Sequence, residues 1–391
     1  MGKSLGLYIH IPFCHSKCDY CDFYSLAGTD ARMKAYQKAL LRHLRETAPR
    51  TLNYTVDTVY FGGGPPSYYG EQRLRPLLQT IQKFFSLSQK PEITVEANPD
   101  SLDEKTLDRL YRDGFNRLSI GMQSADDRQL RALGRPHTFA QTQTAFKAAR
   151  TAGFDNISLD LMLGLPGQTM EDWKASLGAA IELDPEHISC YILKLEENTP
   201  LYARRNTLAL PDDDMQADMY LRMVSLLKEA GYAQYEISNF AKPGKESRHN
   251  LKYWKLGEYI GLGPGAHSDF DGCRYSFSAN LENYINGIKT GASLVDSFEQ
   301  IPSRERQGEY LMLRLRTAEG IERTEYSRAF GREFDPLEAL MKKYVQQGWA
   351  AFEKGRWHFT PEGFLISNQL IGELLEAQKE YKYDQPYQRR R

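Results

Sequence analysis

The sequence predicts an α/β fold, built as a partial (β/α)6 TIM-like barrel with a C-terminal helical, winged-helix-like module. Short apolar segments alternate with amphipathic segments of ten or more residues in the first half of the chain. This alternation is typical of parallel strands joined by helices. Six such units fit before the pattern weakens after Leu195. In a barrel of this kind, the chemistry is expected on the loops that follow the strands.

The expected elements follow one another in the order strand, loop, helix. Apolar runs bounded by turn residues mark the strands, and a spacing of three to four residues between apolar positions marks the helices. We expect strands at residues 5–11, 56–61, 92–97, 117–122, 157–162 and 187–193, and helices at residues 30–47, 72–85, 102–112, 139–152 and 170–183.

The second half of the sequence predicts a less regular structure. A long amphipathic helix, a strand and a segment rich in glycine and aromatic residues are expected at 212–230, 233–237 and 242–275. Helices at 305–315, 335–346 and 364–378, with a hairpin at 350–360, indicate the winged-helix-like module. We therefore predict three domains, at residues 1–200, 201–300 and 301–391.

The composition excludes several classes of partner. The 391 residues carry a formal net charge of −1, and 41% of them are hydrophobic. This balance gives no basis for a nucleic-acid partner. The sequence has no apolar run long enough to span a bilayer and no signal peptide at its start. We therefore expect a cytoplasmic protein with no stable membrane insertion; the composition leaves its oligomeric state open.

Three of the five cysteines, Cys14, Cys18 and Cys21, lie within eight residues of one another, directly after the first expected strand. Thiolates are the soft ligands that iron–sulfur clusters need, and three cysteines would leave one iron of a four-iron cluster open. A zinc site is the alternative. Structural zinc usually takes four protein ligands, and neither a fourth cysteine nor a close histidine pair is evident, although His15 lies within the loop.

The spacing Cys-x3-Cys-x2-Cys, followed by Phe23, resembles the radical S-adenosylmethionine superfamily over about the first two hundred residues. The resemblance implies a [4Fe–4S] cluster on the three cysteines, with S-adenosylmethionine at the open iron. In that superfamily the cluster passes one electron to the sulfonium and a C–S bond breaks homolytically. The cofactors supply this chemistry, and the protein positions them.

Further segments resemble the oxygen-independent coproporphyrinogen dehydrogenase-like group of this superfamily. The run from Tyr8 to Cys14, Tyr-Ile-His-Ile-Pro-Phe-Cys, is a signature of the group, and three glycines follow the second strand where the family binds the methionine amine. Glycines let a backbone approach a ligand closely, and an arginine can bind a carboxylate through two nitrogens. The resemblance implies that the residues binding S-adenosylmethionine are Tyr8, Gly63, Gly64, Pro65, Glu96, Gln123, Arg135 and Asp160.

Two positions depart from the pattern of that group. The family usually has threonine where this chain has Pro65, so one hydroxyl and one N–H are absent beside the expected methionine site. The dehydrogenases carry a fourth cysteine where this chain has Phe23. The second departure favours the sister group, the haem chaperones of the HemW type.

A second motif supports that subgroup. Residues 248–254, Arg-His-Asn-Leu-Lys-Tyr-Trp, resemble the His-Asn-x-x-Tyr-Trp haem-binding signature of those chaperones. Histidine is a common axial ligand of haem iron, and aromatic rings can cover a porphyrin. Without the motif, the histidine would be interpreted as an ordinary polar residue. We expect His249 to bind the iron, with His267 as the competing ligand, Tyr253 and Trp254 against the porphyrin, and Arg248 and Lys245 near the propionates.

The resemblance implies a haem chaperone that binds haem, a [4Fe–4S] cluster and S-adenosylmethionine, and that passes haem to an acceptor protein, with respiratory proteins as one class of acceptor. The alternative is an oxygen-independent coproporphyrinogen III dehydrogenase or another radical S-adenosylmethionine enzyme. A third hypothesis is a regulatory module whose cluster only senses redox state. The presence of Phe23 and of the motif around His249 disfavours the dehydrogenase.

Overall fold

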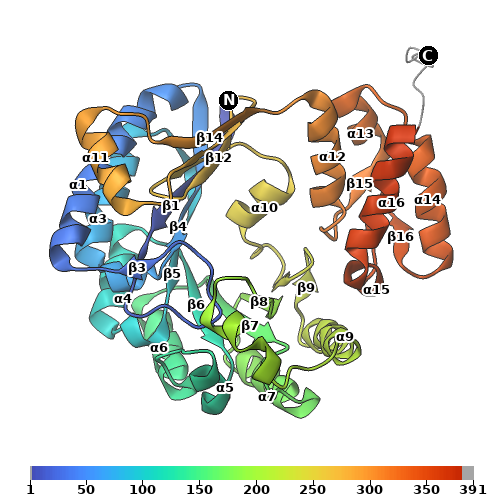
Figure 1. Cartoon of the computed structure of the whole chain (residues 1–391), viewed down its shortest axis with the longest axis horizontal. Helices are drawn as coiled ribbons and strands as arrows, with labels where there is room; N and C mark the ends of the chain where they lie inside the picture. The colour runs from blue at the N-terminus through green and yellow to red at the C-terminus, as the bar shows by residue number, and fades with distance from the viewer. Residues whose placement is uncertain (1, 381–391) are drawn as a thin grey trace.

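A twelve-stranded sheet forms the centre of the protein and curves into an open barrel (Figure 1). The structure is a computed structural model and describes residues 2–380. The strand order is β14-β13-β12-β11-β1-β4-β5-β6-β7-β8-β10-β9. Because β14 and β9 are the two ends of this order, the barrel is partial rather than closed.

Six consecutive parallel strands form the middle of this sheet, each paired with the next in chain order. They confirm the expected strand–helix units of the first half. Their bounds are β1 (Lys3–Ile11), β4 (Tyr54–Gly63), β5 (Leu87–Ala97), β6 (Arg117–Gln123), β7 (Ile157–Leu163) and β8 (His187–Ile192).

Helices that connect these strands cover the outer face of the barrel (Figure 1). Side chains at their first turns fix where several begin: Thr138 and Thr169 each form a reciprocal capping box with the third helical residue. Left-handed glycines end two of them, at Gly114 and Gly153. The covering helices are α1 (Asp30–Thr47), α3 (Glu71–Phe84), α4 (Glu104–Asp113), α6 (Phe139–Ala152) and α7 (Met170–Glu182), with the short α2 (Pro66–Tyr69) and α5 (Asp127–Ala132) between them.

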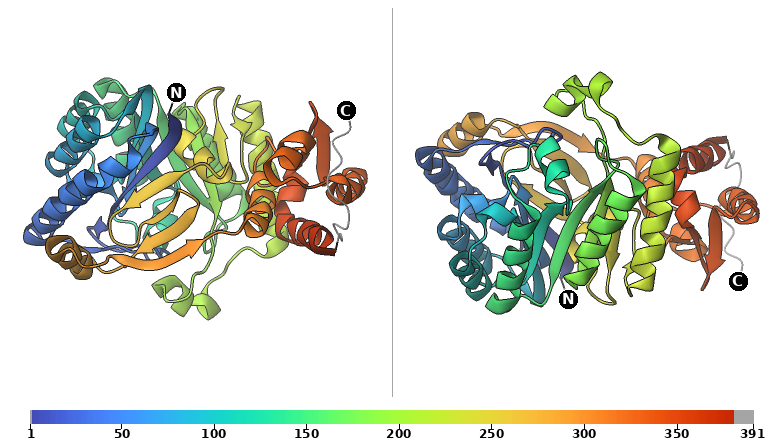
Figure 2. Two further views of the ribbon diagram at one scale, coloured as in Figure 1. Left: turned by 90° about the horizontal axis from the view of Figure 1, so that it is seen from above. Right: turned by 90° about the horizontal axis from the view of Figure 1, so that it is seen from below.

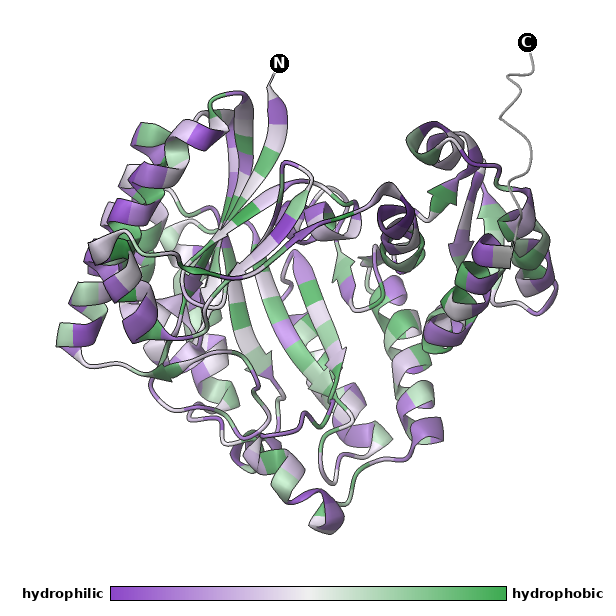
Figure 3. Cartoon of the chain, turned by 45° about the horizontal axis from the view of Figure 1, so that its top comes forward, coloured by the Kyte–Doolittle hydropathy of each residue, from purple (hydrophilic) through white to green (hydrophobic). Residues whose placement is uncertain are grey.

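The parallel strands alternate between apolar and polar residues, which Figure 3 shows as alternating bands. In β6, Leu118 and Ile120 belong to the hydrophobic core, whereas Arg117 and Ser119 line a cavity inside the barrel. Since successive side chains of a strand point to opposite faces, the apolar set packs under the helices and the polar set faces inward. The fold thus places polar groups inside the barrel, where a ligand can reach them.

Additional strands extend both edges of the parallel sheet. Next to β1 lies β11 (Tyr259–Leu262), which is parallel to it, and the three strands beyond are antiparallel. The sequence predicted this region only as rich in glycine and aromatic residues. At the other edge, β9 spans two residues and is shorter than the expected strand at 233–237. The extensions are β12 (His267–Phe270), β13 (Cys273–Phe277), β14 (Val295–Gln300), β10 (Asn239–Ala241) and β9 (Ala233–Gln234), with α9 (Asp213–Glu229), α10 (Arg248–Trp254) and α11 (Leu281–Thr290).

The C-terminal part is a separate group of helices around a three-stranded sheet, at one end of the molecule (Figure 2). The predicted hairpin is present as β16 and β17, and an isolated bridge between Glu236 and Thr317 joins this part to the barrel region. The elements are α12 (Ser303–Arg314), β15 (Ile321–Glu322), α13 (Arg323–Phe330), α14 (Asp335–Gln346), β16 (Ala350–Glu353), β17 (Arg356–Phe359), α15 (Pro361–Leu365) and α16 (Ser367–Glu380).

The α/β partial barrel with a helical C-terminal part is confirmed. The domain boundaries at residues 200 and 300 stay predictions, and residues 381–391 of the expected third domain lie outside the described residues. Within residues 2–380, no helix combines the length and the apolar character needed to cross a bilayer.

Candidate functional site

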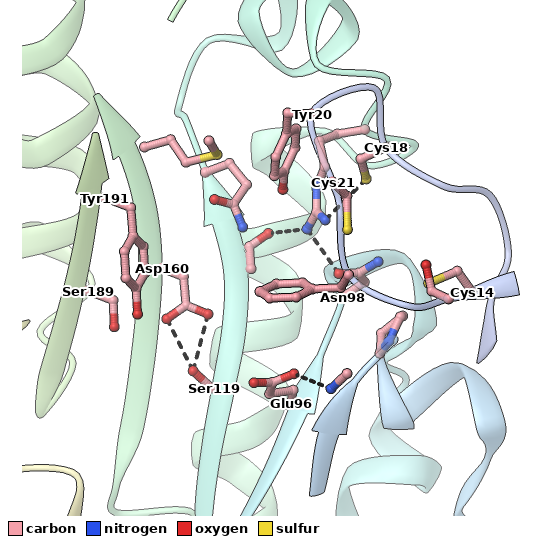
Figure 4. A pocket seen from close by; sticks show the side chains of 18 of the residues that line it. Cys14, Cys18, Tyr20, Cys21, Glu96, Asn98, Ser119, Asp160, Ser189 and Tyr191 are labelled. Atoms are coloured by element: carbon pink, nitrogen blue, oxygen red, sulfur yellow. Dashed lines mark hydrogen bonds between the residues drawn. The ribbon is translucent and has the colours of Figure 1, made fainter. Parts of the chain in front are cut away.

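A cavity of about 630 Å³ lies inside the barrel and opens at the carboxyl ends of the parallel strands. This volume falls within the roughly 300–1,000 Å³ that is typical of small-molecule sites. Side chains from β5, β6, β7 and β8 converge on it beneath the cysteine loop (Figure 4). Of the residues expected from the sequence, the cavity is lined by Cys14, Cys18, Cys21, Gly63, Pro65, Glu96, Gln123, Arg135 and Asp160.

The three clustered cysteines all face this cavity. All three are free thiols, and a short pairing of β2 (Phe13–Cys14) with β3 (Leu26–Ala27) closes their loop. Within the described part of the chain, no three His, Cys, Asp or Glu side chains are placed to hold a single metal ion. A four-iron cluster takes each cysteine on a different iron. Three thiols that share one cavity without converging on one point therefore fit such a cluster better than they fit zinc.

Two contacts hold the cysteine loop over the cavity. His10 on β1 contacts the Tyr24 carbonyl through Nε2 at 3.0 Å, and burial lowers the pKa of His10 to about 4, so the ring is neutral. Arg135 Nη1 lies 3.6 Å from Cys18 Sγ.

Burial raises the pKa of the Cys21 thiol to about 11. The ligand-free loop therefore holds Cys21 as a neutral thiol at neutral pH, and a metal would have to displace its proton.

Arg135 joins the cysteine loop to two strands. Its Nη2 donates to Asn98 Oδ1 at 2.9 Å and to the Gly121 carbonyl at 2.7 Å. Its Nε is buried and has no hydrogen-bond partner among the described residues. The sequence predicted that Arg135 binds a ligand carboxylate, and the structure places it as a positioning group with one nitrogen left over.

Two carboxylates face the cavity below the loop (Figure 4). Glu96 accepts hydrogen bonds from the Tyr60 hydroxyl at 2.7 Å and from the Gly63 amide at 3.2 Å. Burial raises the pKa of Glu96 to about 7, although the bond from Tyr60 opposes this shift. Asp160 accepts from the Ser119 hydroxyl at 3.1 Å, and burial raises its pKa as well. Both can accept hydrogen bonds from an amine or a ribose.

The glycine turn after β4 packs directly against the cysteine loop. Gly63 has a φ of +110°, which side chains rarely tolerate. A Cβ on Gly64 would lie 2.5 Å from the Phe13 carbonyl oxygen, so a larger residue would push the loop away. Pro65 follows in an extended conformation, with φ −70° and ψ 110°, and lines the cavity. The glycines are thus required by packing as well as by any ligand.

Gln123 and Tyr8, two residues expected to bind S-adenosylmethionine, are placed differently. Gln123 ends β6 with a φ of +62° and lines the cavity. A left-handed conformation at a residue other than glycine costs energy and is concentrated at functional sites. The Tyr8 hydroxyl instead contacts His10 Nδ1 at 3.0 Å, and its ring stacks near Tyr60. Tyr8 therefore supports the residues that line the cavity.

His249, the expected haem ligand, is fully buried at the start of α10. Its Nδ1 contacts Thr58 Oγ1 and its Nε2 contacts the Tyr253 hydroxyl, each at 2.8 Å. Its ring stacks on Tyr60 with 5.1 Å between centroids, and burial lowers its pKa to about 3. The cavity lining includes its neighbour Asn250 but not His249 itself. One ring nitrogen would have to exchange its partner before it could bind iron.

Three other residues that were expected near the haem, Arg248, Lys245 and His267, lie apart from the cavity lining. Arg248 Nη1 donates to the Lys90 carbonyl at 2.9 Å, and Lys245 Nζ donates to the Asp155 carbonyl at 2.8 Å. His267 is exposed at the start of β12. The two cations expected near the propionates are therefore engaged at the surface of the barrel.

Sequence reasoning missed several polar residues that line the cavity. They come from the inward-facing positions of the parallel strands or from the turns after them, and the alternation within each strand was the available signal. Without knowing which face was inward, the sequence could not select them. They include Asn98, Arg117, Ser119, Ser189 and Tyr191.

Comparison with known families gives two matches along the chain. Residues 8–180 match the radical SAM superfamily, and residues 301–366 match the HemN C-terminal domain. A solved structure of coproporphyrinogen III oxidase (HemN) from Escherichia coli, a radical SAM enzyme, superposes with a TM-score of 0.81. The superposition covers 97% of this chain and 91% of that one at 22% sequence identity, a likeness that concerns the fold.

Characterised relatives are similar over nearly the whole chain. The haem chaperone HemW of Bacillus subtilis (strain 168) is 36% identical over 372 residues, which covers 94% of this chain and 98% of that protein. The haem chaperone HemW of Escherichia coli (strain K12) is 36% identical over 378 residues, with 96% and 98% covered. The relative from Lactococcus lactis is 34% identical over 378 residues. The similarity extends over nearly the whole length of this chain and of these relatives.

Proposed function

Because the chain belongs to the HemW haem-chaperone family within the radical SAM superfamily, we propose that it binds haem and transfers it to an acceptor protein. Membership of the superfamily implies a [4Fe–4S] cluster and S-adenosylmethionine. The observation that most supports this assignment is one cavity that brings together three free thiols, the carboxyl groups of Glu96 and Asp160, and a glycine turn.

The cluster would be held by Cys14, Cys18 and Cys21, the donors that the cavity offers. When bound, it supplies one-electron reduction of a ligand at its open iron. S-adenosylmethionine would lie below it, against Glu96 and Asp160. Their oxygens can accept hydrogen bonds from the methionine amine and from the ribose.

Two measurements test the proposed function. Haem-loaded, cluster-containing protein should transfer haem to a haem-free acceptor of respiration, which visible spectra of the separated acceptor would show. The variant with Ala at all three cluster cysteines should show no iron–sulfur absorption after anaerobic reconstitution. A full cluster in that variant, or zinc without iron in protein purified anaerobically, would contradict the assignment.

The enzyme alternative is tested separately. Phe23 stands where the dehydrogenases carry a cysteine, and its side chain is exposed at the edge of the cavity. The protein should therefore not convert coproporphyrinogen III to protoporphyrinogen IX. Formation of more than one equivalent of product, measured by chromatography, would replace the chaperone assignment by the enzyme.

A further inference from the structure

Arg117 is a buried arginine with two nitrogens that have no hydrogen-bond partner among the described residues. It begins β6 and is only 1% exposed, and its side chain lines the barrel cavity. The two nitrogens are Nε and Nη1. A guanidinium removed from water costs considerable free energy unless it is paired. Such a group inside a cavity indicates a missing anionic partner.

A second unpartnered group lies beside it. Thr94 on β5 is the register partner of Arg117, so the two side chains share the inner face of neighbouring strands. Thr94 is fully buried next to the cavity without being part of its lining, and its Oγ1 also has no partner within the described residues. A hydroxyl and a guanidinium both donate hydrogen bonds, and together they offer a carboxylate one donor from each of two strands.

Glu96 and Asp160, the carboxyl groups that the parallel strands contribute to the cavity, do not fill this role. Glu96 already accepts from Tyr60 and Gly63, and Asp160 accepts from Ser119. The carboxyl groups of Glu96 and Asp160 both attract the Arg117 guanidinium electrostatically, but neither forms a hydrogen bond with it. The nearby His249 is neutral because burial lowers its pKa to about 3. The donors of Arg117 therefore stay available to a ligand.

Arg117 lies at the opposite end of β6 from Gln123, one of the residues expected to bind S-adenosylmethionine. Both residues line the cavity. Six residues of strand, at about 3.3 Å each, separate the two Cα atoms by at most roughly 20 Å. Arg117 therefore lies at the end of the cavity farther from the cysteine loop, next to Glu96 and Asp160, which both attract its guanidinium.

We propose that Arg117 and Thr94 bind a carboxylate of the porphyrin cargo at this end of the cavity. The inference rests on the proposed haem function, because haem carries two propionates. It also replaces the expected propionate partners: Arg248 and Lys245 donate to backbone carbonyls of Lys90 and Asp155 instead. A guanidinium binds a carboxylate bidentately, which gives orientation as well as affinity.

The test compares two probes: haem, and iron protoporphyrin IX dimethyl ester, which lacks the charged carboxylates. In anaerobic titrations the parent protein should bind haem at least about tenfold more tightly than the ester, the effect of one charge-assisted hydrogen bond. Arg117→Gln should lose this preference, and Arg117→Lys should keep part of it. Arg248→Gln and Lys245→Gln are matched controls and should keep all of it.

Each outcome has one meaning. A parent that binds neither probe contradicts the proposed function and the inference with it. A parent that binds both probes equally, or an Arg117→Gln variant that keeps the preference, contradicts the inference alone. Loss of the preference in Arg248→Gln would assign the carboxylate to the residue expected from the sequence.

A stability measurement separates binding from a structural role. If Arg117 serves only as a counter-ion for Glu96 and Asp160, Arg117→Met should lower the melting temperature of the ligand-free protein. If its donors are kept for a ligand, the variant should melt at the parent temperature or above, because an unpaired buried charge has been removed. A lower melting temperature together with an unchanged probe preference would overturn the inference.

Discussion

Gly63 donates its backbone amide to the Glu96 carboxylate at 3.2 Å, which ties the glycine turn after β4 to the end of β5. Both residues were expected to bind S-adenosylmethionine, and 33 positions separate them in the sequence. The bond shows that the ligand-free cavity is already organised by its own residues. A bound amine would share the Glu96 carboxylate with Gly63 and Tyr60.

Glu96 should make the stability of the ligand-free protein fall with rising pH. Its pKa is raised from 4.5 to about 7 by burial, so between these values the folded state holds a proton that the unfolded state has lost. Stability is then greatest below about pH 4.5 and decreases until about pH 7. Glu96→Gln should remove this component and stabilise the protein at pH 8 by up to about 3 kcal/mol.

The measurement is urea denaturation of parent and variant from pH 4.5 to 8. The difference between the two proteins isolates Glu96 from buried histidines, whose lowered pKa values act in the opposite direction. Glu236→Gln is the positive control and should show a similar dependence on pH. Burial also raises the pKa of Glu236 to about 7, and this residue does not line the cavity. A Glu96→Gln difference that does not change with pH would show that Glu96 is ionised throughout.

Gln123→Gly should separate stability from ligand binding. Glycine relieves the left-handed strain at this position, so the free energy of unfolding should rise by about 1 kcal/mol. Binding of S-adenosylmethionine should weaken, because the amide that faces the cavity is lost. Lys354→Gly is the matched control: Lys354 also has a positive φ, at 50°, but lies in the C-terminal hairpin. Unchanged binding in Gln123→Gly would remove Gln123 from the site.

Pro65→Thr should tighten the binding of S-adenosylmethionine. Threonine can adopt the φ of −70° and ψ of 110° found at this position, and these angles also suit a residue that precedes Pro66. The change adds a hydroxyl and an N–H beside the cavity, and one hydrogen bond contributes about 0.5–1.5 kcal/mol, or roughly two- to tenfold in affinity. Weaker binding by calorimetry would mean that the turn has adapted to proline.

The sequence predicted the parallel half of the fold because each strand–helix unit carries its own apolar pattern. It missed β11, which is four residues long and lies in a segment where glycines obscure the alternation. β11 is recognisable as a barrel strand only through its pairing with β1, a contact between distant segments. Local patterns contain no information about such partners.

The candidate site was predictable where a motif fixes the chemistry, as in the three cysteines. Arg117 escaped notice because a lone arginine at the start of a strand is usually exposed, and only the assembled barrel buries it. The strain at Gln123 has no signal in its residue type. The surroundings of His249 depend on Thr58 and Tyr60 of β4, about 190 residues away.

Tyr253→Phe should strengthen haem binding if His249 supplies the iron ligand through Nε2. The Tyr253 hydroxyl occupies that nitrogen at 2.8 Å, and phenylalanine keeps the aromatic face while freeing it. The loss of one competing hydrogen bond predicts a two- to tenfold gain in affinity, measured by anaerobic haem titration. Tyr259→Phe, a change in the ring that packs edge-on against Tyr253, is the control and should have no such effect. Weaker haem binding in Tyr253→Phe would favour a different ligand.

The most direct measurement of the central claim is anaerobic haem titration of the parent protein, His249→Ala and His267→Ala, followed by visible spectra. The account predicts that the parent binds haem and that His249→Ala loses most of this binding while keeping its cluster and its affinity for S-adenosylmethionine. His267→Ala, altered at an exposed residue, should bind like the parent. Parental haem binding by His249→Ala with loss in His267→Ala would contradict the ligand assignment, and a parent that binds no haem would contradict the account.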